Sequence, residues 1–223
     1  GIREKIVEIA TAGGAGLVGF ADRSDTPEER RASLPRSVSF AVPLTPEITR
    51  GIAAGPTPDY AAEYDRVNRV IETVATSAAE VLAGEGFRAV PMSSTVLEID
   101  KSTFLTNFLP HKTSATRAGL GWIGRCALLV TKEYGSAVRL GTVFTDAPFD
   151  CDEPVVESRC GTCRECVEHC PARAVTGTKW AQGMERSELY DVHACYEHVH
   201  RNAKRPEIGK TICGICIAVC PWT

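Results

Sequence analysis

The chain has 223 residues, of which 43% are hydrophobic and 24% are charged, and its formal net charge is −3. These proportions are typical of a globular protein and exclude a disordered or collagen-like chain. The sequence has no apolar run long enough to span a membrane, no secretory signal at its start, and not the basic charge that nucleic-acid binding favours.

Hydrophobic spacing predicts helices that alternate with strands over the first two thirds of the chain. Helices are predicted over 2–12, 58–84 and 112–118. Strands are predicted over 17–21, 37–42, 87–91, 127–131 and 138–145. A polar loop is predicted over 22–35, and no element is assigned to 92–110. This alternation indicates an α/β or α+β layered domain that ends near residue 148.

The distribution of cysteine predicts where this domain ends. None of the ten cysteines precedes Cys126, and eight lie between Cys160 and Cys220. Between the two parts, residues 147–159 are rich in proline and acidic residues, which is typical of a linker. We therefore predict two domains, 1–148 and 149–223.

The cysteines from residue 160 onward follow the spacing of a two-cluster ferredoxin. In the bacterial pattern C-x₂-C-x₂-C-x₃-C-P, three thiolates bind one cluster and the fourth binds the other. This pattern begins at Cys160, and a second run from Cys213 lacks one cysteine, which Cys195 supplies. We predict two 4Fe–4S clusters that exchange their last ligands. The first set is Cys160, Cys163, Cys166 and Cys220, and the second is Cys170, Cys195, Cys213 and Cys216.

Zinc sites and disulfides are the alternatives for these cysteines. C-x₂-C pairs do form zinc sites, but zinc needs neither a three-cysteine run nor a proline after each fourth cysteine. Two cysteines remain outside the count: Cys126, predicted to be a buried core thiol, and Cys151, which has no evident partner. Since exposed clusters are oxidised readily, we expect a cytoplasmic protein from cells with anaerobic or low-oxygen metabolism.

Two Gly-x-Gly-x-x-Gly matches stand in the wrong context for dinucleotide binding. That fingerprint needs a strand before it and a helix after it. The matches at 14–19 and 119–124 each follow a predicted helix and precede a strand. A turn explains the first match, whereas the second leaves room for a large cofactor other than a dinucleotide.

Two polar features lie in the cysteine-rich part. Asp191-x-His193 matches only the start of the D-x-H-x-x-G motif of corrinoid proteins, because Tyr196 replaces its glycine. We expect His193 to lie at the surface or to contact a metal ligand without binding the metal itself. The basic stretch 198–210 is predicted to be a solvated loop, with a docking patch for an electron donor or an anionic partner as the alternative.

Several sequence blocks resemble epoxyqueuosine reductases, and reductive dehalogenases carry related blocks. They are AGLGWIGR at 118–125, LLV at 128–130, YGSxxRLGxxxTD at 134–146, and the cysteine runs to CPW at 220–222. The resemblance implies an α+β protein: a nitroreductase-like α/β sandwich domain that holds cobalamin, then a two-cluster ferredoxin-like domain. It implies that cofactor contacts come from Lys112, Gly119, Gly121, Trp122, Gly124 and Arg139.

The sequence departs from epoxyqueuosine reductases at two places. Their acidic segment D-x-x-P-x-x-E would place its Asp near Leu105 and Thr106, and His111-Lys112 stand at its Glu–Arg position. Those enzymes also continue past the point where Thr223 ends this sequence, into a helical-repeat region that binds tRNA. With the acidic net charge, this predicts that tRNA is not a partner.

A reductase that protonates its product needs an acid near the reacting centre. The candidates are Tyr64, His111, Lys112, Glu98 and Asp100. We predict His111 and Tyr64 as catalytic residues, because histidine donates protons near neutral pH. Packing in the core is the alternative for Tyr64, which lies one helical turn after Tyr60.

Three functions remain open at this point. The first is a corrinoid-dependent reductase that takes electrons from a low-potential donor such as ferredoxin or flavodoxin and reduces a small molecule. The second is an electron-transfer or activation protein for a partner corrinoid protein. The third is a flavin reductase in the same fold, with FMN instead of cobalamin.

Overall fold

The computed structural model describes residues 1–223 apart from residues 32, 93 and 95–109. Contacts divide the chain into two compact units of three segments each. The first unit comprises Gly1–Val42, Val67–Leu120 and Arg139–Val155, and the second comprises Pro43–Arg66, Gly121–Val138 and Val156–Thr223. Both units draw segments from before residue 148, and the functional division at that residue stays a prediction.

A four-stranded sheet with the order β1-β2-β6-β3 is the framework of the first unit. Its strands are β1 (Leu17–Asp22), β2 (Arg36–Pro43), β3 (Ala89–Met92) and β6 (Val138–Thr145). β1 and β2 are antiparallel with Leu17 opposite Ala41, and so are β3 and β6 with Ala89 opposite Thr145. The predicted strands over 17–21, 37–42 and 138–145 are therefore confirmed. β3 begins later than predicted, because the Phe87 amide still bonds to the Leu82 carbonyl at the end of the preceding helix.

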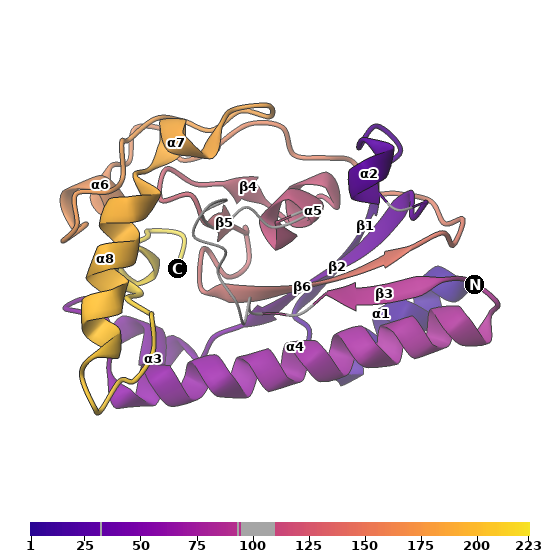
Figure 1. The fold of residues 1–223 in the computed structure, drawn as a ribbon, viewed down its shortest axis with the longest axis horizontal. Coiled ribbons are helices and arrows are strands. Elements are labelled where there is room, and N and C mark those ends of the chain that lie inside the picture. Colours follow the sequence, from indigo (N-terminus) through magenta and orange to yellow (C-terminus); the bar gives the residue numbers. More distant parts are fainter. Residues whose placement is uncertain (32, 93, 95–109) are drawn as a thin grey trace. The chain divides into compact units, whose positions relative to one another are not determined.

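Helices cover both faces of this sheet (Figure 1). Helices α1 (Ile2–Ala12) and α4 (Pro58–Gly84) confirm the predictions, and both contribute apolar side chains to the main core. That core also takes Phe20, Val38, Phe40 and Val143 from the strands. On the other face, α5 (His111–Arg117) lies against β1, where a Cβ at Gly19 would stand 2.3 Å from the Ala118 carbonyl oxygen. The first unit is thus a layered α+β structure, as predicted.

Short elements build most of the second unit. They are α3 (Pro46–Arg50), β4 (Trp122–Ile123), β5 (Leu129–Val130), α6 (Glu165–Glu168), α7 (Arg186–Leu189), α8 (Val192–Ala203) and α9 (Ile215–Ala218). Neither α3 nor β4 was predicted, and α2 (Glu28–Arg31) lies in a segment predicted as loop. The strand predicted from 127 begins only at Leu129, because Ala127 has a φ of 59° and lies in a turn.

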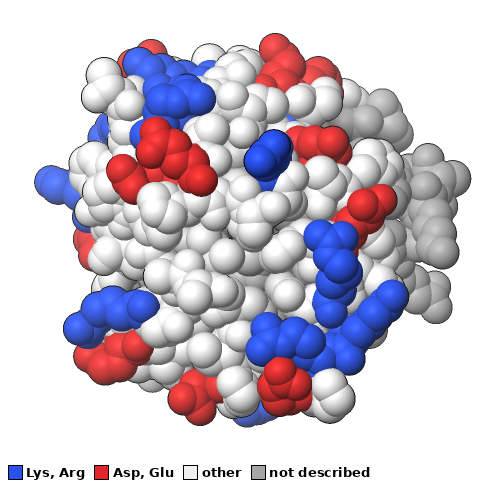
Figure 2. Space-filling model, turned by 90° about the vertical axis from the view of Figure 1, so that its left-hand side faces the viewer, with Lys and Arg blue, Asp and Glu red and all other residues white. Residues whose placement is uncertain are grey.

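Helix α8 corrects the prediction of a loop over the first part of the basic stretch 198–210, as far as Ala203, whereas residues 204–210 lie outside helices and strands. Asp191 caps the helix by accepting hydrogen bonds from the amides of His193 and Ala194, so its carboxylate serves the helix start. His193 is exposed, in agreement with a surface position. On the face that Figure 2 shows, lysine and arginine side chains lie next to aspartate and glutamate. Among the described residues, no helix is long and apolar enough to cross a membrane.

Candidate metal centre

A β-hairpin in the second unit carries the end of the glycine block. Trp122 pairs with Val130 and Ile123 with Leu129 in the β4–β5 ladder. The Gly124 amide bonds to the Leu128 carbonyl at 2.8 Å and closes the turn. The tip of the hairpin therefore presents two consecutive side chains, Arg125 and Cys126.

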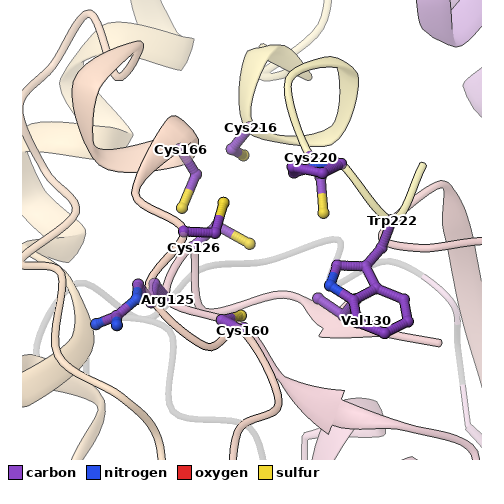
Figure 3. A pocket seen from close by; sticks show the side chains of 11 residues that line it. Arg125, Cys126, Val130, Cys160, Cys166, Cys216, Cys220 and Trp222 are labelled. Atoms are coloured by element: carbon purple, nitrogen blue, oxygen red, sulfur yellow. The ribbon is translucent and has the colours of Figure 1, made fainter. Parts of the chain in front are cut away.

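The hairpin tip lies at a pocket that is rich in thiols (Figure 3). The pocket belongs entirely to the second unit. It is lined by Gly124, Arg125, Cys126, Val130, Cys160, Cys163, Cys166, Cys216, Cys220, Pro221 and Trp222. All four cysteines predicted for the first cluster are among these residues, and Cys220 is sixty positions away from Cys160 in the sequence. The fold thus brings together the set that the crosswise ligand exchange requires.

Three cysteines of the second predicted set lie close to one another. Burial raises the pKa of the Cys195 thiol, and the neighbouring Cys170 and Cys213 raise it further. Burial is also the main cause of the raised pKa of Cys213, with Cys170 again close enough to contribute. The fourth member, Cys216, lines the pocket of the first set. The two sets are therefore neighbours within the second unit.

All ten cysteines lie in the described part of the chain and are free thiols. Among the described residues, no three His, Cys, Asp or Glu side chains converge as the ligands of a single metal ion do. A four-iron cubane spaces its thiolates more widely than one ion does, and the thiol-lined pocket fits such a group.

Cys126 is buried, as predicted, but its surroundings are thiols. It lines the same pocket as Cys166 and Cys216, one cysteine from each predicted set. Cys166 has the largest influence on the pKa of Cys126 and lowers it, while Cys216 and burial raise it, and the net pKa is raised. Cys126 is in turn the main cause of the raised pKa of Cys166. Sequence reasoning missed this position because Cys126 lies outside both cysteine runs.

Arg125 ties the hairpin to the loops that carry the cysteines. Its side chain is buried and donates hydrogen bonds to the carbonyls of Gly177 and of Gly161, the latter at 2.8 Å. Gly161 lies between Cys160 and Cys163, so the guanidinium holds the first ligand loop. This buried cation beside a thiol pocket also offsets the negative charge that thiolates bring. The sequence analysis included Arg125 in the glycine block at 118–125 but did not predict that it binds the cysteine loop.

The glycines of the block make close approaches to the protein's own chain. A Cβ at Gly119 would lie 2.9 Å from the Glu153 carbonyl oxygen, and one at Gly121 would lie 2.2 Å from that of Val130. At Gly124 a Cβ would stand 2.8 Å from Val130 Cγ2, 3.3 Å from the Cys126 sulfur and 3.6 Å from the Cys160 sulfur. Gly124 therefore keeps the thiol pocket open. Contacts of these glycines with a corrin remain a prediction.

Trp122 and the last residues of the chain meet beside the pocket. The indole of Trp122 is buried and packs edge-on against Trp222, with 4.9 Å between ring centroids. A Cβ at Gly135 would lie 2.4 Å from the Thr223 amide nitrogen, and the Ser136 amide bonds to the Thr223 hydroxyl at 3.2 Å. The residues after Cys220 are thus fixed to the segment that follows the hairpin.

The remaining predicted site residues divide between the two units. In the first unit, His111 Nδ1 lies 2.9 Å from the Thr142 hydroxyl, and Arg139 Nε donates to Asn68 at 2.7 Å. Lys112 is half-buried in the same unit. Tyr64 is half-buried in the second unit. Glu98, Asp100, Leu105 and Thr106 lie outside the described residues.

Tyr60, one turn before Tyr64, lies against the second cysteine run. A Cβ at Gly214 would stand 3.0 Å from Tyr60 Cε1 and 2.4 Å from Ile52 Cδ1. Gly214 has a φ of 86° and follows Cys213 directly. The segment Pro43–Arg66 therefore supports the ligand loop from behind, and Tyr60 is buried there.

Comparison with known proteins identifies the cysteine-rich part. Residues 159–223 match the family described as a 4Fe-4S double cluster binding domain. An epoxyqueuosine reductase of Pseudomonas aeruginosa is 32% identical over 146 residues, which is 61% of this chain and 34% of that protein. The chain thus spans about a third of the length of this curated relative.

Solved structures share the fold. A catabolic reductive dehalogenase matches 98% of this chain and 31% of its own, with a TM-score of 0.70 and 20% identity. An epoxyqueuosine reductase in complex with an epoxyqueuosine-modified tRNA stem loop matches 99% of this chain and 64% of its own, with a TM-score of 0.64 and 21% identity. The predicted α+β fold with a two-cluster domain is confirmed.

The second of these structures corrects one prediction. We predicted that tRNA is not a partner, whereas a protein that shares this fold over 99% of the chain was solved with a tRNA stem loop. The error lies in the use of net charge, because a charge of −3 is a sum over the whole chain and nucleic acid contacts a local surface. A slightly acidic sum therefore does not exclude tRNA.

Proposed function

We propose that this chain, which belongs to the superfamily of epoxyqueuosine reductases and reductive dehalogenases, is an iron–sulfur oxidoreductase that passes electrons from two 4Fe–4S clusters to cobalamin. The first cluster is held by Cys160, Cys163, Cys166 and Cys220, and the second by Cys170, Cys195, Cys213 and Cys216. Electrons enter from a low-potential donor such as ferredoxin or flavodoxin.

The observation that carries the electron-transfer part is the thiol pocket. Ligands from both ends of the cysteine-rich part line it together with Gly124 and Arg125 of the glycine block. Arg125 is hydrogen-bonded to the loop between Cys160 and Cys163, so the block that marks the superfamily also shapes the cluster site. Cys216 reaches the same pocket, which supports a short path between the two clusters.

Cobalamin enters the proposal through the superfamily. When bound, it supplies a low-valent cobalt that reduces the substrate. The protein's own backbone fills the space beside Gly119 and Gly121, so these two glycines serve the packing of the chain itself.

His111 is the proposed proton donor. It begins α5, is half-buried, and has Nδ1 within 2.9 Å of the Thr142 hydroxyl, a contact that fixes the plane of the imidazole ring. An oriented imidazole is suited to proton transfer. Tyr64 is proposed as a second donor. Lys112 and Arg139 are proposed cofactor contacts.

An electron-transfer role for a partner corrinoid protein is the second candidate. It is favoured by the sequence, which has Leu105 and Thr106 where epoxyqueuosine reductases carry the Asp of their acidic segment. In that case this chain would reduce the cobalt of another protein. The two candidates share the clusters and differ in which protein binds the corrinoid.

A cobalamin titration tests the proposal. The chain is reconstituted anaerobically with iron and sulfide, and hydroxocobalamin is added while the absorption spectrum is recorded. A base-off spectrum that saturates near one cobalamin per chain supports the reductase. No spectral change with cobalamin, but reduction of a corrinoid protein by the dithionite-reduced chain, supports the second candidate. Binding of FMN instead would support the flavin alternative.

The substrate class is tested by the same preparation. An epoxyqueuosine-modified tRNA stem loop and a panel of halogenated aromatic compounds are supplied with reduced ferredoxin under anaerobic conditions. Mass spectrometry of the stem loop detects loss of the epoxide oxygen, and halide release detects dehalogenation. Turnover of the stem loop at a rate above that of free cobalamin would identify tRNA as the substrate.

A further inference from the structure

The ligand count leaves one buried thiol at the cluster site without a role. Eight cysteines complete the two predicted sets, and Cys126 is not among them. Yet Cys126 lines the same pocket as five of the eight, on the tip of the β4–β5 hairpin. Figure 3 shows it below Cys166 and Cys216 and above Cys160.

The position of Cys126 relates it to both ligand sets. Its buried thiol lines the same pocket as Cys166 of the first set and Cys216 of the second, and Figure 3 shows all three side chains close together. A ligand of one cluster would belong to one set, whereas a group that contacts one member of each lies beside both. The neighbouring Gly124 has no side chain, and a Cβ there would stand 3.3 Å from the Cys126 sulfur. The hairpin therefore leaves the Cys126 thiol room to face the cluster ligands.

We propose that the buried thiol of Cys126 donates a hydrogen bond to a ligand sulfur of one of the two clusters and so raises the reduction potential of that cluster. The inference rests on the proposed function, because it assumes that Cys166 and Cys216 bind clusters. It assigns Cys126 as a positioning and tuning residue and not as a ninth ligand.

The direction of the effect follows from charge. A cysteine thiol has one S–H donor. Reduction adds an electron to the cluster and makes its thiolates more negative, so a donor to a ligand sulfur stabilises the reduced state more than the oxidised one. Hydrogen bonds to the sulfurs are among the factors that set cluster potentials. Removal of the donor therefore lowers the potential.

The test compares three variants of the full chain after anaerobic reconstitution. Cys126→Ala removes the donor, and Cys126→Ser keeps an O–H donor in nearly the same volume. Cys151→Ala is the matched control, because Cys151 is a free, half-buried thiol of the first unit. Iron and sulfide are counted, and the clusters are titrated potentiometrically with EPR detection.

We expect all three variants to retain about eight irons per chain, which is two four-iron clusters. The potential of one cluster should become more negative in Cys126→Ala, remain closer to that of the unmodified chain in Cys126→Ser, and not change in Cys151→Ala. Unchanged potentials in Cys126→Ala, or a shift to less negative values, would overturn the inference.

Loss of about four irons in both Cys126→Ala and Cys126→Ser would also overturn it, since that result makes Cys126 a ligand. If only Cys126→Ala fails to assemble, the serine variant decides through its iron count and potential. Failure of the proposed function gives a different result: the unmodified chain itself would then hold zinc or fewer than eight irons. The two failures are therefore distinguishable.

Discussion

Arg125 shows how a single buried cation holds a ligand loop. Its guanidinium donates to two carbonyls, those of Gly161 and Gly177, from the tip of a hairpin whose own strands are two residues long. So short a ladder adds little stability by itself. The two charge-assisted hydrogen bonds therefore help to fix the hairpin to the first cysteine loop.

Replacement of Arg125 should weaken this attachment. Arg125→Gln removes the guanidinium that donates to both carbonyls, and the loss at the buried Gly177 carbonyl costs about 1–3 kcal/mol. Arg125→Lys keeps the charge but lacks the planar fork, so we expect an intermediate loss. Anaerobic urea unfolding measures the change, and the rate of iron release to a chelator should rise in the same order.

Arg50→Gln is the control for the Arg125 variants. Arg50 pairs with Glu47 on α3, and both side chains are at least 70% exposed. Loss of an exposed pair of this kind changes stability by less than about 1 kcal/mol. Equal effects of Arg50→Gln and Arg125→Gln would contradict the role given to Arg125.

Gly124 also affects the shape of the pocket, because it has no side chain. We expect Gly124→Ala to reduce cluster occupancy, because its Cβ would stand 2.8 Å from Val130 Cγ2 and close to two sulfurs. Overpacking of this kind typically costs about 1–3 kcal/mol. Iron content after reconstitution and the midpoint of thermal unfolding measure the effect.

Gly84→Ala provides the comparison for this substitution. Gly84 ends α4, and a Cβ there would meet no atom within 4 Å. Alanine in a helix is more stable than glycine by roughly 0.5–1 kcal/mol, so this variant should keep its iron and unfold at the same or a higher temperature. A full iron content in Gly124→Ala would show that the pocket tolerates a methyl group.

At the scale of elements, Glu63 joins the start of α4 to the start of α3. The buried carboxylate accepts hydrogen bonds from the amide and hydroxyl of Thr45, the residue that precedes α3, at 2.8 and 2.9 Å. The Arg66 hydrogen bond is the largest cause that lowers the pKa of Glu63, from 4.5 to about 2. Helix α3 and the first part of α4 lie in the segment Pro43–Arg66, which supports the second cysteine run.

This lowered pKa predicts how stability depends on pH. The carboxylate is stabilised in the folded state, so its contribution is complete above pH 4.5 and is lost as the pH falls toward 2. Glu63→Gln should therefore be less stable than the unmodified chain at pH 7, by about 1–3 kcal/mol. The difference between the two proteins in urea unfolding should shrink below pH 4.5. A difference that is constant over this range would exclude ionisation as its source.

The sequence predicted long elements better than short ones. The spacing of apolar residues predicted α1, α4 and β6, because a period repeated over many residues distinguishes a helix from a strand. The β4–β5 hairpin has only four residues in strands, and its turn depends on Ala127 at a positive φ, which no periodicity reveals. Helix α8 was missed because its charged residues were interpreted as a solvated loop, although Asp191 is a good N-cap.

The same contrast holds for the site. Cysteine spacing alone brought Cys160, Cys163, Cys166 and Cys220 into one predicted set, and the fold places all four at one pocket. Arg125 and Cys126 were not predicted as neighbours of this pocket, because they reach it from a hairpin far away in the sequence. The spacing of cysteines in the sequence predicts the cluster ligands, but the residues around those ligands are known only from the fold.

For the whole molecule, the count of thiolates gives the most direct prediction. The reconstituted chain should hold about eight irons and eight sulfides, and Cys195→Ala should hold about four of each, because the second cluster loses a ligand. Chemical analysis of iron and sulfide, with EPR of the reduced protein, measures this. Cys151→Ala should retain the full content. Two intact clusters in Cys195→Ala would refute the ligand assignment.

The interleaved make-up of the second unit affects how the protein is made. Its three segments are separated by stretches of the first unit, which is complete once the ribosome has synthesised Val155. Cys220 emerges well after Cys160, so a nascent chain displays three thiols of the first set before their fourth partner exists. We therefore expect the complete ligand set of the first cluster to form only after Cys220 has been synthesised, when the first unit already has all its segments.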